Sequence, residues 1–391
     1  MEEKGKLYAS HRSQTLGLSG IREIFEKAQT IPDVIRLEFG EPDFDTPSNI
    51  KEAAIRAINS GYTKYSSSAG VLDLRKAVSE KLKKENSVDY DASREVVITA
   101  GATSAINLAL LATLDSGDEI LVPDPGWASY VHAVKLVGAK PVLYPLQESE
   151  TFQFNPDIVE ELVSPNTKAI LINTPANPMG SVFSRKSIQA IAELSLRHNL
   201  YVISDEVYEK FLYQDEGFTE HVSIASLNEM KERTVTINAL SKTYAMTGWR
   251  IGYAAANDTI AGAMIRINAA ASSCVSTITQ YAALEALTGP QDSVARMISA
   301  FAERRRILVN GLNKFNGFKC SMPRGAFYAF PNVAGTGYNS KDLAMKILNE
   351  SHVATVPGSA FGNQGEGYLR VAYANSVENI QQALDRMKKI L

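Results

Sequence analysis

The stretch TVTINALSKTYAMTGWRIGY, residues 234–253, places a lysine just after an apolar strand pattern. Residues 234–239 are mostly apolar or β-branched, which predicts a buried strand. Lys242 follows that strand beside Ser241, and Arg250 comes eight positions later between two glycines. A lysine at the end of a core strand costs hydration free energy unless its amine is used. The pattern therefore indicates a buried amine with a chemical role.

The segments before this stretch alternate between short apolar runs and longer helical patterns. The runs predicted as strands are residues 96–99, 119–122, 168–172 and 201–204, and the helical patterns between them include residues 105–114 and 187–198. Nearly continuous apolar strands separated by helices are typical of a largely parallel sheet covered on both faces. The sequence therefore predicts an α/β fold, in which ligands bind beyond the carboxyl ends of the strands.

A second region with a different pattern follows residue 290. A long helical pattern at 292–312 leads into predicted strands at 326–330, 353–356 and 367–372 and a final helix at 377–390. The length of 391 residues also favours two domains. We expect a large domain at residues 47–290 and a smaller α/β domain at residues 291–391, with residues 1–46 packed on the smaller one.

Composition and charge are those of an ordinary globular protein. Hydrophobic residues make up 45% of the chain and charged residues 21%, and a net charge of −3 gives no reason to expect nucleic acid or an anionic membrane surface as a partner. Cys274 and Cys320 are too few for a disulfide framework. No apolar run approaches the roughly 18–20 residues of a membrane helix, and the charged N-terminus does not look like a secretory signal. We therefore expect a cytoplasmic protein.

The neighbours of Lys242 suit one particular use of a buried amine. Burial and nearby cations lower the pKa of a lysine, which lets it form a Schiff base with an aldehyde cofactor. Ser241 and Arg250 would suit a phosphate group on that cofactor. Residues 101–104, GATS, open a helix directly after a strand and would offer free N–H groups to the same anion. A surface salt bridge is the alternative for Arg250.

Asp205 and Tyr208 follow the predicted strand at residues 201–204. One interpretation is that Asp205 is the N-cap of the next helix. The other pairs Asp205 with a protonated ring nitrogen and Tyr208 with a phenolic oxygen of the same ring. A buried carboxylate–cation contact at ~4 Å contributes roughly 4 kcal/mol at an effective dielectric near 20. Such a contact would keep a pyridine nitrogen protonated and hence able to accept electrons.

Three more side chains stand where a ligand could meet them, and each has a structural alternative. Asn177 lies in the loop NTPANPMG, residues 173–180, and is either a turn residue or a donor to the phenolic oxygen. Trp127 is either part of the core or a stacking partner for a flat ring. Arg370 lies in an apolar run and needs an anion, which is either a substrate carboxylate or Glu366.

Together these motifs resemble the class I pyridoxal-phosphate aminotransferases of fold type I, in the branch of aspartate and aromatic aminotransferases. The resemblance runs from about residue 19 to the C-terminus, and no G-x-G-x-x-G, P-loop, H-E-x-x-H or G-x-S-x-G motif points elsewhere. The motifs that carry it are GEPDFDTP (40–47), YTKY (62–65), NTPANPMG (173–180), SDEVY (204–208), residues 241–253, PRGAFY (323–328), VPGSAFG (356–362) and LR (369–370). The family's fold implies a mostly parallel seven-stranded sheet sandwiched by helices, plus a smaller α/β domain.

The resemblance implies a role for each matching residue. Lys242 would bind pyridoxal 5′-phosphate covalently and then move the proton released from the substrate. Asp205 would hold the pyridine nitrogen, while Asn177 and Tyr208 would bond the phenolic oxygen. The residues implied to hold the ring face and the phosphate are Trp127, Ala102, Thr103, Ser241 and Arg250. Those implied to bind the substrate are Arg370, Gly40, Trp127 and Asn177, and Tyr65 would reach the phosphate of the neighbouring subunit in a homodimer.

Two positions depart from the family's pattern. Met179 replaces the usual threonine after Asn-Pro and leaves Asn177 itself in place. Thr103 stands where many aspartate-specific members carry a lysine, and a threonine cannot neutralise a substrate's second carboxylate. Residues 267–274 contain no arginine, which leaves Arg266 as the nearby candidate to replace it. The amino donor therefore stays open between aspartate, aromatic and alanine-type amino acids.

The expected reaction is ping-pong transamination from an L-amino acid to a 2-oxo acid, with 2-oxoglutarate as the expected acceptor. A carbon–sulfur β-lyase on the same scaffold is the alternative, because it would use the same cofactor residues. A cofactor-binding regulator would need a DNA-binding domain, and the chain has neither the extra ~70 residues nor the basic block to build one.

Overall fold

The computed structural model describes residues 9–14, 20–214 and 221–391. Its helices are α1 (His11–Gln14), α2 (Gly20–Ala28), α3 (Ser48–Asn59), α4 (Leu72–Asn86), α5 (Ala102–Thr113), α6 (Ser129–Val137), α7 (Pro156–Glu160), α8 (Arg185–Arg197), α9 (Leu240–Thr243), α10 (Asp258–Ser272), α11 (Thr277–Thr288), α12 (Asp292–Leu312), α13 (Ser340–Ser351) and α14 (Val377–Met387). Its strands are β1 (Ile35–Arg36), β2 (Val96–Thr99), β3 (Glu119–Asp124), β4 (Lys140–Pro145), β5 (Thr167–Asn173), β6 (Tyr201–Asp205), β7 (Thr234–Ala239), β8 (Gly252–Ala255), β9 (Tyr328–Ala329), β10 (Val353–Ala354), β11 (Val356–Pro357) and β12 (Leu369–Ala372). Within these ranges, no helix combines the length and apolarity needed to cross a lipid bilayer.

Seven strands form one sheet in the order β2-β8-β7-β6-β5-β3-β4. Neighbouring strands run parallel except for β8, which is antiparallel to both β2 and β7. The predicted mostly parallel seven-stranded sheet is confirmed. The sequence pattern does not predict β4 or β8, for two physical reasons. The edge strand β4 contains two prolines, which are tolerated only at an edge, and the residues of β8, GYAA, have mostly short side chains with weak strand preference.

Alternate residues of the sheet pack on opposite faces, as the pleat of a strand requires. Ile120 and Val122 of β3 lie in a core with α5, α6 and α10, whereas Leu121 lies in a core with α7 and α8. Burial of each such side chain contributes roughly 1.5–3 kcal/mol. Both faces are therefore covered by apolar side chains, and a polar ligand can meet the sheet only at the ends of its strands.

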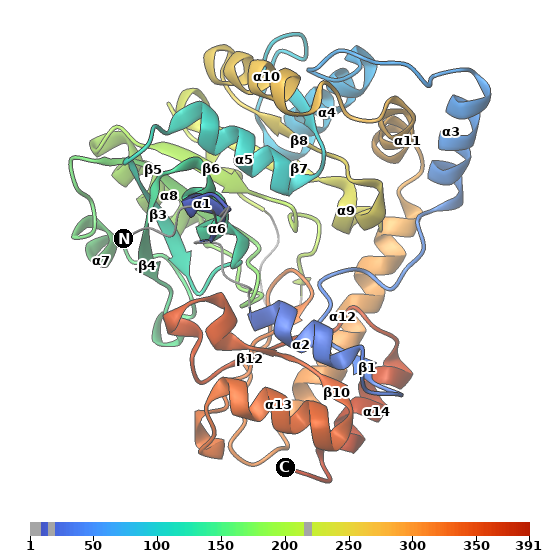
Figure 1. The fold of residues 1–391 in the computed structure, drawn as a ribbon, viewed down its shortest axis with the longest axis vertical. Coiled ribbons are helices and arrows are strands. Elements are labelled where there is room, and N and C mark those ends of the chain that lie inside the picture. Colours follow the sequence, from blue (N-terminus) through green and yellow to red (C-terminus); the bar gives the residue numbers. More distant parts are fainter. Residues whose placement is uncertain (1–8, 15–19, 215–220) are drawn as a thin grey trace, which may run out of the picture.

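The C-terminal elements form a smaller α/β unit. β9 and β11 pair antiparallel with β12, and β1 pairs parallel with β10. Figure 1 shows α2 and β1, in blue, beside the orange and red C-terminal elements. Ile24 and Leu37 share one buried core with Phe301 of α12 and Leu369 of β12. These contacts support the division into residues 47–290 and residues 1–46 with 291–391, which stays a prediction.

A buried ion pair fixes the turn that follows β6. The Nζ of Lys81 on α4 donates to the carboxylate of Glu209, and the two side chains are only 11% and 7% exposed. Asn86, at the end of α4, donates to the same carboxylate at 2.8 Å. Burial alone would raise the pKa of Glu209, but Lys81 and His221 outweigh burial and lower that pKa to about 2. The carboxylate is therefore stable in the interior only because its partners are present.

We predict that Lys81→Met lowers the free energy of unfolding by about 3–5 kcal/mol at neutral pH, because it leaves a buried carboxylate without its cation. The matched control is Lys83→Met on the same helix, which breaks an exposed pair with Asp89 and should leave the free energy of unfolding nearly unchanged. Because the pKa of Glu209 is depressed, the difference is complete above its unfolded pKa and is lost as the pH falls towards about 2. Urea unfolding followed by circular dichroism measures both variants, and equal losses would contradict the prediction.

Candidate active site

The carboxyl ends of the central strands surround a cavity of about 470 Å³. The sequence-predicted residues that line it are Gly40, Ala102, Thr103, Trp127, Asn177, Asp205, Tyr208, Ser241, Lys242, Arg250 and Arg370. Tyr65 lies outside this cavity with a side chain that is 89% exposed, and Arg266 is not a lining residue either. The fold thus gathers in one place residues that come from both the large sheet and the smaller unit.

Lys242 ends in the cavity with an amine that has lost most of its hydration. Its Nζ donates to the backbone carbonyl of Gly40 at 2.5 Å. Burial is the main cause that lowers the pKa of this amine from its ordinary 10.5 to about 8. Glu41 opposes the shift, whereas the guanidinium groups of Arg370 and Arg250 add to it. The amine therefore has an uncharged, nucleophilic fraction near neutral pH.

Asp205 is buried at the end of β6 and accepts two hydrogen bonds. Its Oδ2 accepts from the hydroxyl of Tyr130 at 2.6 Å, and its Oδ1 accepts from the N–H of Val207 at 3.2 Å. Burial raises the pKa of Asp205 to about 6, although both hydrogen bonds lower it. The segment after Asp205 forms a turn and not a helix, so the N-cap interpretation is wrong. The carboxylate faces the cavity and would be stabilised by a cation there.

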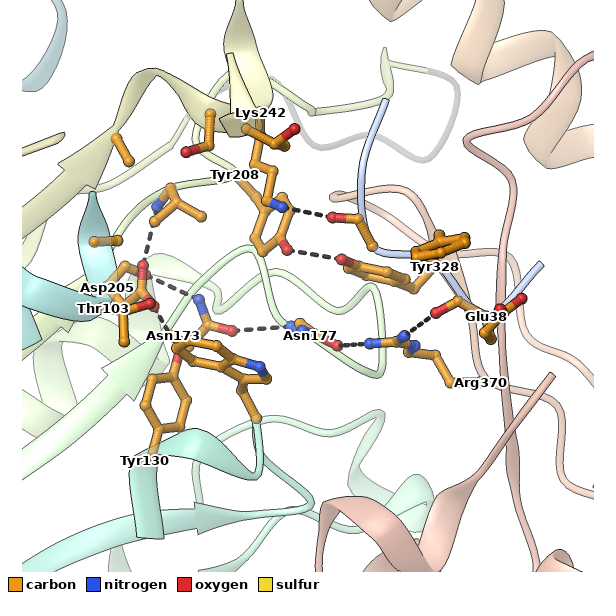
Figure 2. A pocket seen from close by; sticks show the side chains of 18 of the residues that line it. Glu38, Thr103, Tyr130, Asn173, Asn177, Asp205, Tyr208, Lys242, Tyr328 and Arg370 are labelled. Atoms are coloured by element: carbon orange, nitrogen blue, oxygen red, sulfur yellow. Dashed lines mark hydrogen bonds between the residues drawn. The ribbon is translucent and has the colours of Figure 1, made fainter. Parts of the chain in front are cut away.

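A chain of amide hydrogen bonds runs from the end of β6 to Arg370. The Nδ2 of Asn173 donates to the backbone carbonyl of Asp205 at 3.0 Å, and the N–H of Asn177 donates to the Oδ1 of Asn173 at 2.9 Å. The Nη1 of Arg370 then donates to the Oδ1 of Asn177 at 3.1 Å. Figure 2 shows this path across the cavity. Because the amide oxygen of Asn177 accepts from Arg370, its amide nitrogen remains to donate to a ligand.

Arg370 is held rigidly, although it lies in the interior. Its guanidinium carbon lies 4.7 Å from the ring centroid of Tyr328 and 4.9 Å from that of Phe361, and its Nη2 donates to the backbone carbonyl of Glu38. Glu366 instead accepts from Ser340 and Gly367, so the proposed structural partner for Arg370 is wrong. A buried guanidinium without a carboxylate on its donors is suited to a ligand carboxylate.

Tyr208 supplies a hydroxyl that stays protonated. Its oxygen lies 2.8 Å from the hydroxyl of Tyr328, and burial raises the pKa of Tyr208 well above its ordinary value. Figure 2 shows this pair beside the amine of Lys242. A hydroxyl that keeps its proton at every physiological pH is a permanent donor to an anionic oxygen.

The N-terminus of α5 and Arg250 form the anion-binding end of the cavity. Gly101 precedes α5 with a φ of +85°, and a Cβ there would lie 2.8 Å from the Nη2 of Arg250. The positive φ favours glycine here, and the missing Cβ leaves room for the guanidinium beside the free N–H groups of Ala102 and Thr103. The described contacts of Arg250 are the carbonyls of Thr247 and Ala100 and include no carboxylate, so the salt-bridge interpretation is wrong. The arrangement is suited to a phosphate.

Trp127 is part of the core margin, and its role as a stacking partner stays a prediction. It packs edge-on against Tyr130, with ring centroids 5.4 Å apart, and it belongs to the margin of the core that covers the sheet. The same indole also lines the cavity, where its face can stack on a flat ligand.

Several residues of the site are missed by the sequence analysis. Tyr130, Asn173, Tyr328 and Glu38 line the cavity and hold the predicted residues in place. Asn173 and Tyr328 lie within the motifs that carry the family resemblance, so those motifs could have drawn attention to them. Tyr130 and Glu38 lie in apolar or mixed segments, where no local pattern separates a site residue from a core residue.

The comparisons with known proteins agree with this geometry. The family described as aminotransferase class I and II matches residues 32–387. An aspartate aminotransferase of Pyrococcus abyssi is 44% identical over 98% of both chains, and an aromatic-amino-acid aminotransferase of Thermococcus litoralis is 43% identical over 98% of both chains. Among solved structures, the aromatic aminotransferase of Pyrococcus horikoshii has a TM-score of 0.89 at 43% identity, covering 94% of this chain and 98% of that one. The aspartate aminotransferase of Thermus thermophilus with maleate has a TM-score of 0.93 at 36% identity, covering 99% and 100%.

The chain therefore belongs to the class I and II aminotransferases. It is a transferase of fold type I that uses pyridoxal 5′-phosphate, as enzymes of this class do. The relatives support transamination and give no support to the lyase alternative.

We predict that Tyr130→Phe lowers kcat/KM roughly tenfold or more, the effect expected for loss of a hydrogen bond to a charged group. The hydroxyl of Tyr130 lowers the pKa of Asp205, so its removal moves the acid limb of the activity profile to higher pH. Tyr144→Phe is the matched control, because Tyr144 is equally buried and donates to the Leu171 carbonyl at 3.0 Å outside the cavity. The measurement is the steady-state rate of the wild type and both variants from acid to neutral pH. A Tyr130→Phe profile that coincides with that of the control would show that this hydrogen bond is unimportant.

Proposed function

We propose that this enzyme transfers the amino group of an L-amino acid to a 2-oxo acid, with 2-oxoglutarate as the acceptor, by a ping-pong mechanism. The observation that carries the proposal is the amine of Lys242, a nucleophile with a lowered pKa that shares one cavity with the guanidinium groups of Arg250 and Arg370. The names of the relatives support aspartate and aromatic amino acids as donors, and alanine-type donors remain candidates.

The residues present fit pyridoxal 5′-phosphate at each of its functional groups. We assign its aldehyde to Lys242 and its ring nitrogen to Asp205. We assign its phenolic oxygen to Tyr208 and the amide nitrogen of Asn177. The groups assigned to the phosphate are Ala102, Thr103, Ser241 and Arg250, and Trp127 is assigned to the ring face.

When bound, the cofactor supplies an aldehyde for the amino group and a ring that takes up the electron pair released at the substrate Cα. Arg370 binds the α-carboxylate through parallel N–H donors and so fixes the direction of the Cα–H bond. The Nζ of Lys242 accepts the proton from Cα, because its pKa lies close to the working pH. The carboxylate of Asp205 holds the proton on the ring nitrogen, since a buried carboxylate favours a cationic partner.

The place of Tyr65 supports a homodimer with shared active sites. Tyr65 and Tyr62 are 89% and 44% exposed, and they line a surface groove with residues 274–278. Ile55 and Ile58, on α3, are also more than half exposed. An exposed apolar surface of this kind favours association, and Tyr65 would then reach the phosphate of the partner. The molecular mass in solution tests this assignment.

Two free cysteines support action in the cytoplasm. Cys320 is buried and Cys274 is partly buried, and neither forms a disulfide in the described structure. Free thiols are usual in a reducing compartment.

The proposed function is tested by mixing the cofactor-loaded enzyme with one amino acid at a time. We expect the visible band of the bound cofactor to disappear with one 2-oxo acid released per site, and 2-oxoglutarate to restore it. Lys242→Ala lacks the proton acceptor, so it should convert the cofactor far more slowly than the wild type does. Continuous release of ammonia and pyruvate, with no 2-oxo acid added as amino acceptor, would instead establish a lyase.

A further inference from the structure

A dicarboxylic substrate such as 2-oxoglutarate brings two negative charges into the cavity, and Arg370 accounts for one of them. Thr103 cannot neutralise the second, and Arg266 does not line the cavity. Among the described lining residues, the guanidinium groups are those of Arg22, Arg250 and Arg370. Arg250 belongs to the phosphate end, so Arg22 is the cation to which no anionic group of the cofactor or substrate has yet been assigned.

Arg22 is held in a way that leaves its charge available. Its Nε contacts the carboxylate of Glu26 at 2.7 Å, one helical turn away, and the two side chains are 62% and 54% exposed. An exposed ion pair at this spacing contributes little to stability, because water screens both charges. A carboxylate that enters the cavity can therefore replace Glu26, or share the guanidinium with it, at little cost.

The helix that carries Arg22 is fixed against the body of the protein. Ile24 and Ala28 of α2 are each 2% exposed and pack in the core of the smaller unit. Glu23 on the same helix pairs with Lys341 at 2.9 Å. The side chain of Arg22 therefore extends from a well-anchored helix.

The same helix also contributes an apolar wall. Phe25 follows Arg22 by three residues, so both side chains lie on the face of α2 that lines the cavity. Phe25 packs edge-on against Phe39 at 5.3 Å, and the guanidinium of Arg36 lies over both rings, at 5.1 and 4.5 Å. Arg36 is also paired with the buried Glu38, so it does not compete with Arg22 for a ligand.

We propose that Arg22 is the specificity residue that binds the distal carboxylate of dicarboxylic substrates. The adjoining rings of Phe25 and Phe39 accept the side chain of an apolar or aromatic substrate. The exposed guanidinium can turn towards water when no second carboxylate is present, so one pocket serves both substrate classes. This proposal rests on the transaminase function proposed above and adds the residue that discriminates between its substrates.

The test uses the cofactor-loaded enzyme and two unreactive probes of equal length, succinate and butanoate, which differ by one carboxylate. Titration calorimetry gives the dissociation constant of each. We expect the wild type to bind succinate at least about tenfold more tightly than butanoate, since a hydrogen bond to a charged group has about this effect. Arg22→Met should weaken succinate binding about tenfold or more and leave butanoate within about twofold. Arg22→Lys should bind succinate with an affinity between those of the wild type and Arg22→Met, because it keeps the charge but loses the planar fork.

The matched control is Lys27→Met, which removes a cation from the same helix that does not line the cavity. It should leave both constants unchanged. The deciding quantity is the ratio of the dissociation constants of succinate and butanoate. Three results would overturn the assignment of Arg22: a ratio near one in the wild type, a ratio that Arg22→Met leaves unaltered, or a ratio that Lys27→Met changes equally. The single-amino-acid experiment separates the two proposals. If amino acids convert the cofactor while Arg22→Met keeps the ratio, only Arg22 is misassigned; if no amino acid converts it, the transaminase proposal itself fails.

Discussion

The site depends on a lysine amine that is largely withdrawn from water and has no carboxylate in contact. The Nζ of Lys242 has a backbone carbonyl as its hydrogen-bond partner, and two guanidinium groups contribute to its lowered pKa. A charged ammonium in this position would lack hydration and would be repelled by both arginines. The fold thereby stabilises the neutral amine, which is the chemically useful form. Positions at the ends of strands make this possible, because the covered faces of the sheet admit no polar group.

The remaining charges of the cavity follow from the same constraint. Arg250 is exposed but donates to two backbone carbonyls beside the N-terminus of α5, and Arg370 is buried against two aromatic rings of the smaller unit, so each cation has a defined position without a ligand. Asp205 supplies a buried carboxylate whose pKa is raised to about 6 by burial, and it gains from any cation that binds beside it. Such preorganised charges need no rearrangement when charge develops during the reaction. Arg22 differs, since its exposed pair with Glu26 can give way to a carboxylate of the substrate.

Much of the sheet and the reactive residues can be predicted from the sequence, because both leave local signals. Apolar runs followed by Lys242, Asp205 or Asn177 place unusual side chains at strand ends. The hydrogen-bond partners of these residues are harder to predict from the sequence. The bonds from Tyr130 to Asp205 and from Tyr208 to Tyr328 join positions 75 and 120 residues apart, and such pairs exist only after the sheet and the smaller unit have formed. The same reason explains why Glu366 was the wrong partner for Arg370: closeness in sequence favoured it, whereas its carboxylate is satisfied by Ser340 and Gly367.

The most direct test of the account is the pH dependence of cofactor uptake by Lys242. Cofactor-free enzyme is mixed with pyridoxal 5′-phosphate, and the appearance of the visible band is followed across a range of pH. Because the uncharged amine attacks the aldehyde, the rate should rise with pH and reach half its maximum near the lowered pKa of about 8. A midpoint close to the ordinary lysine value of 10.5, or an equal band in Lys242→Ala, would contradict the account.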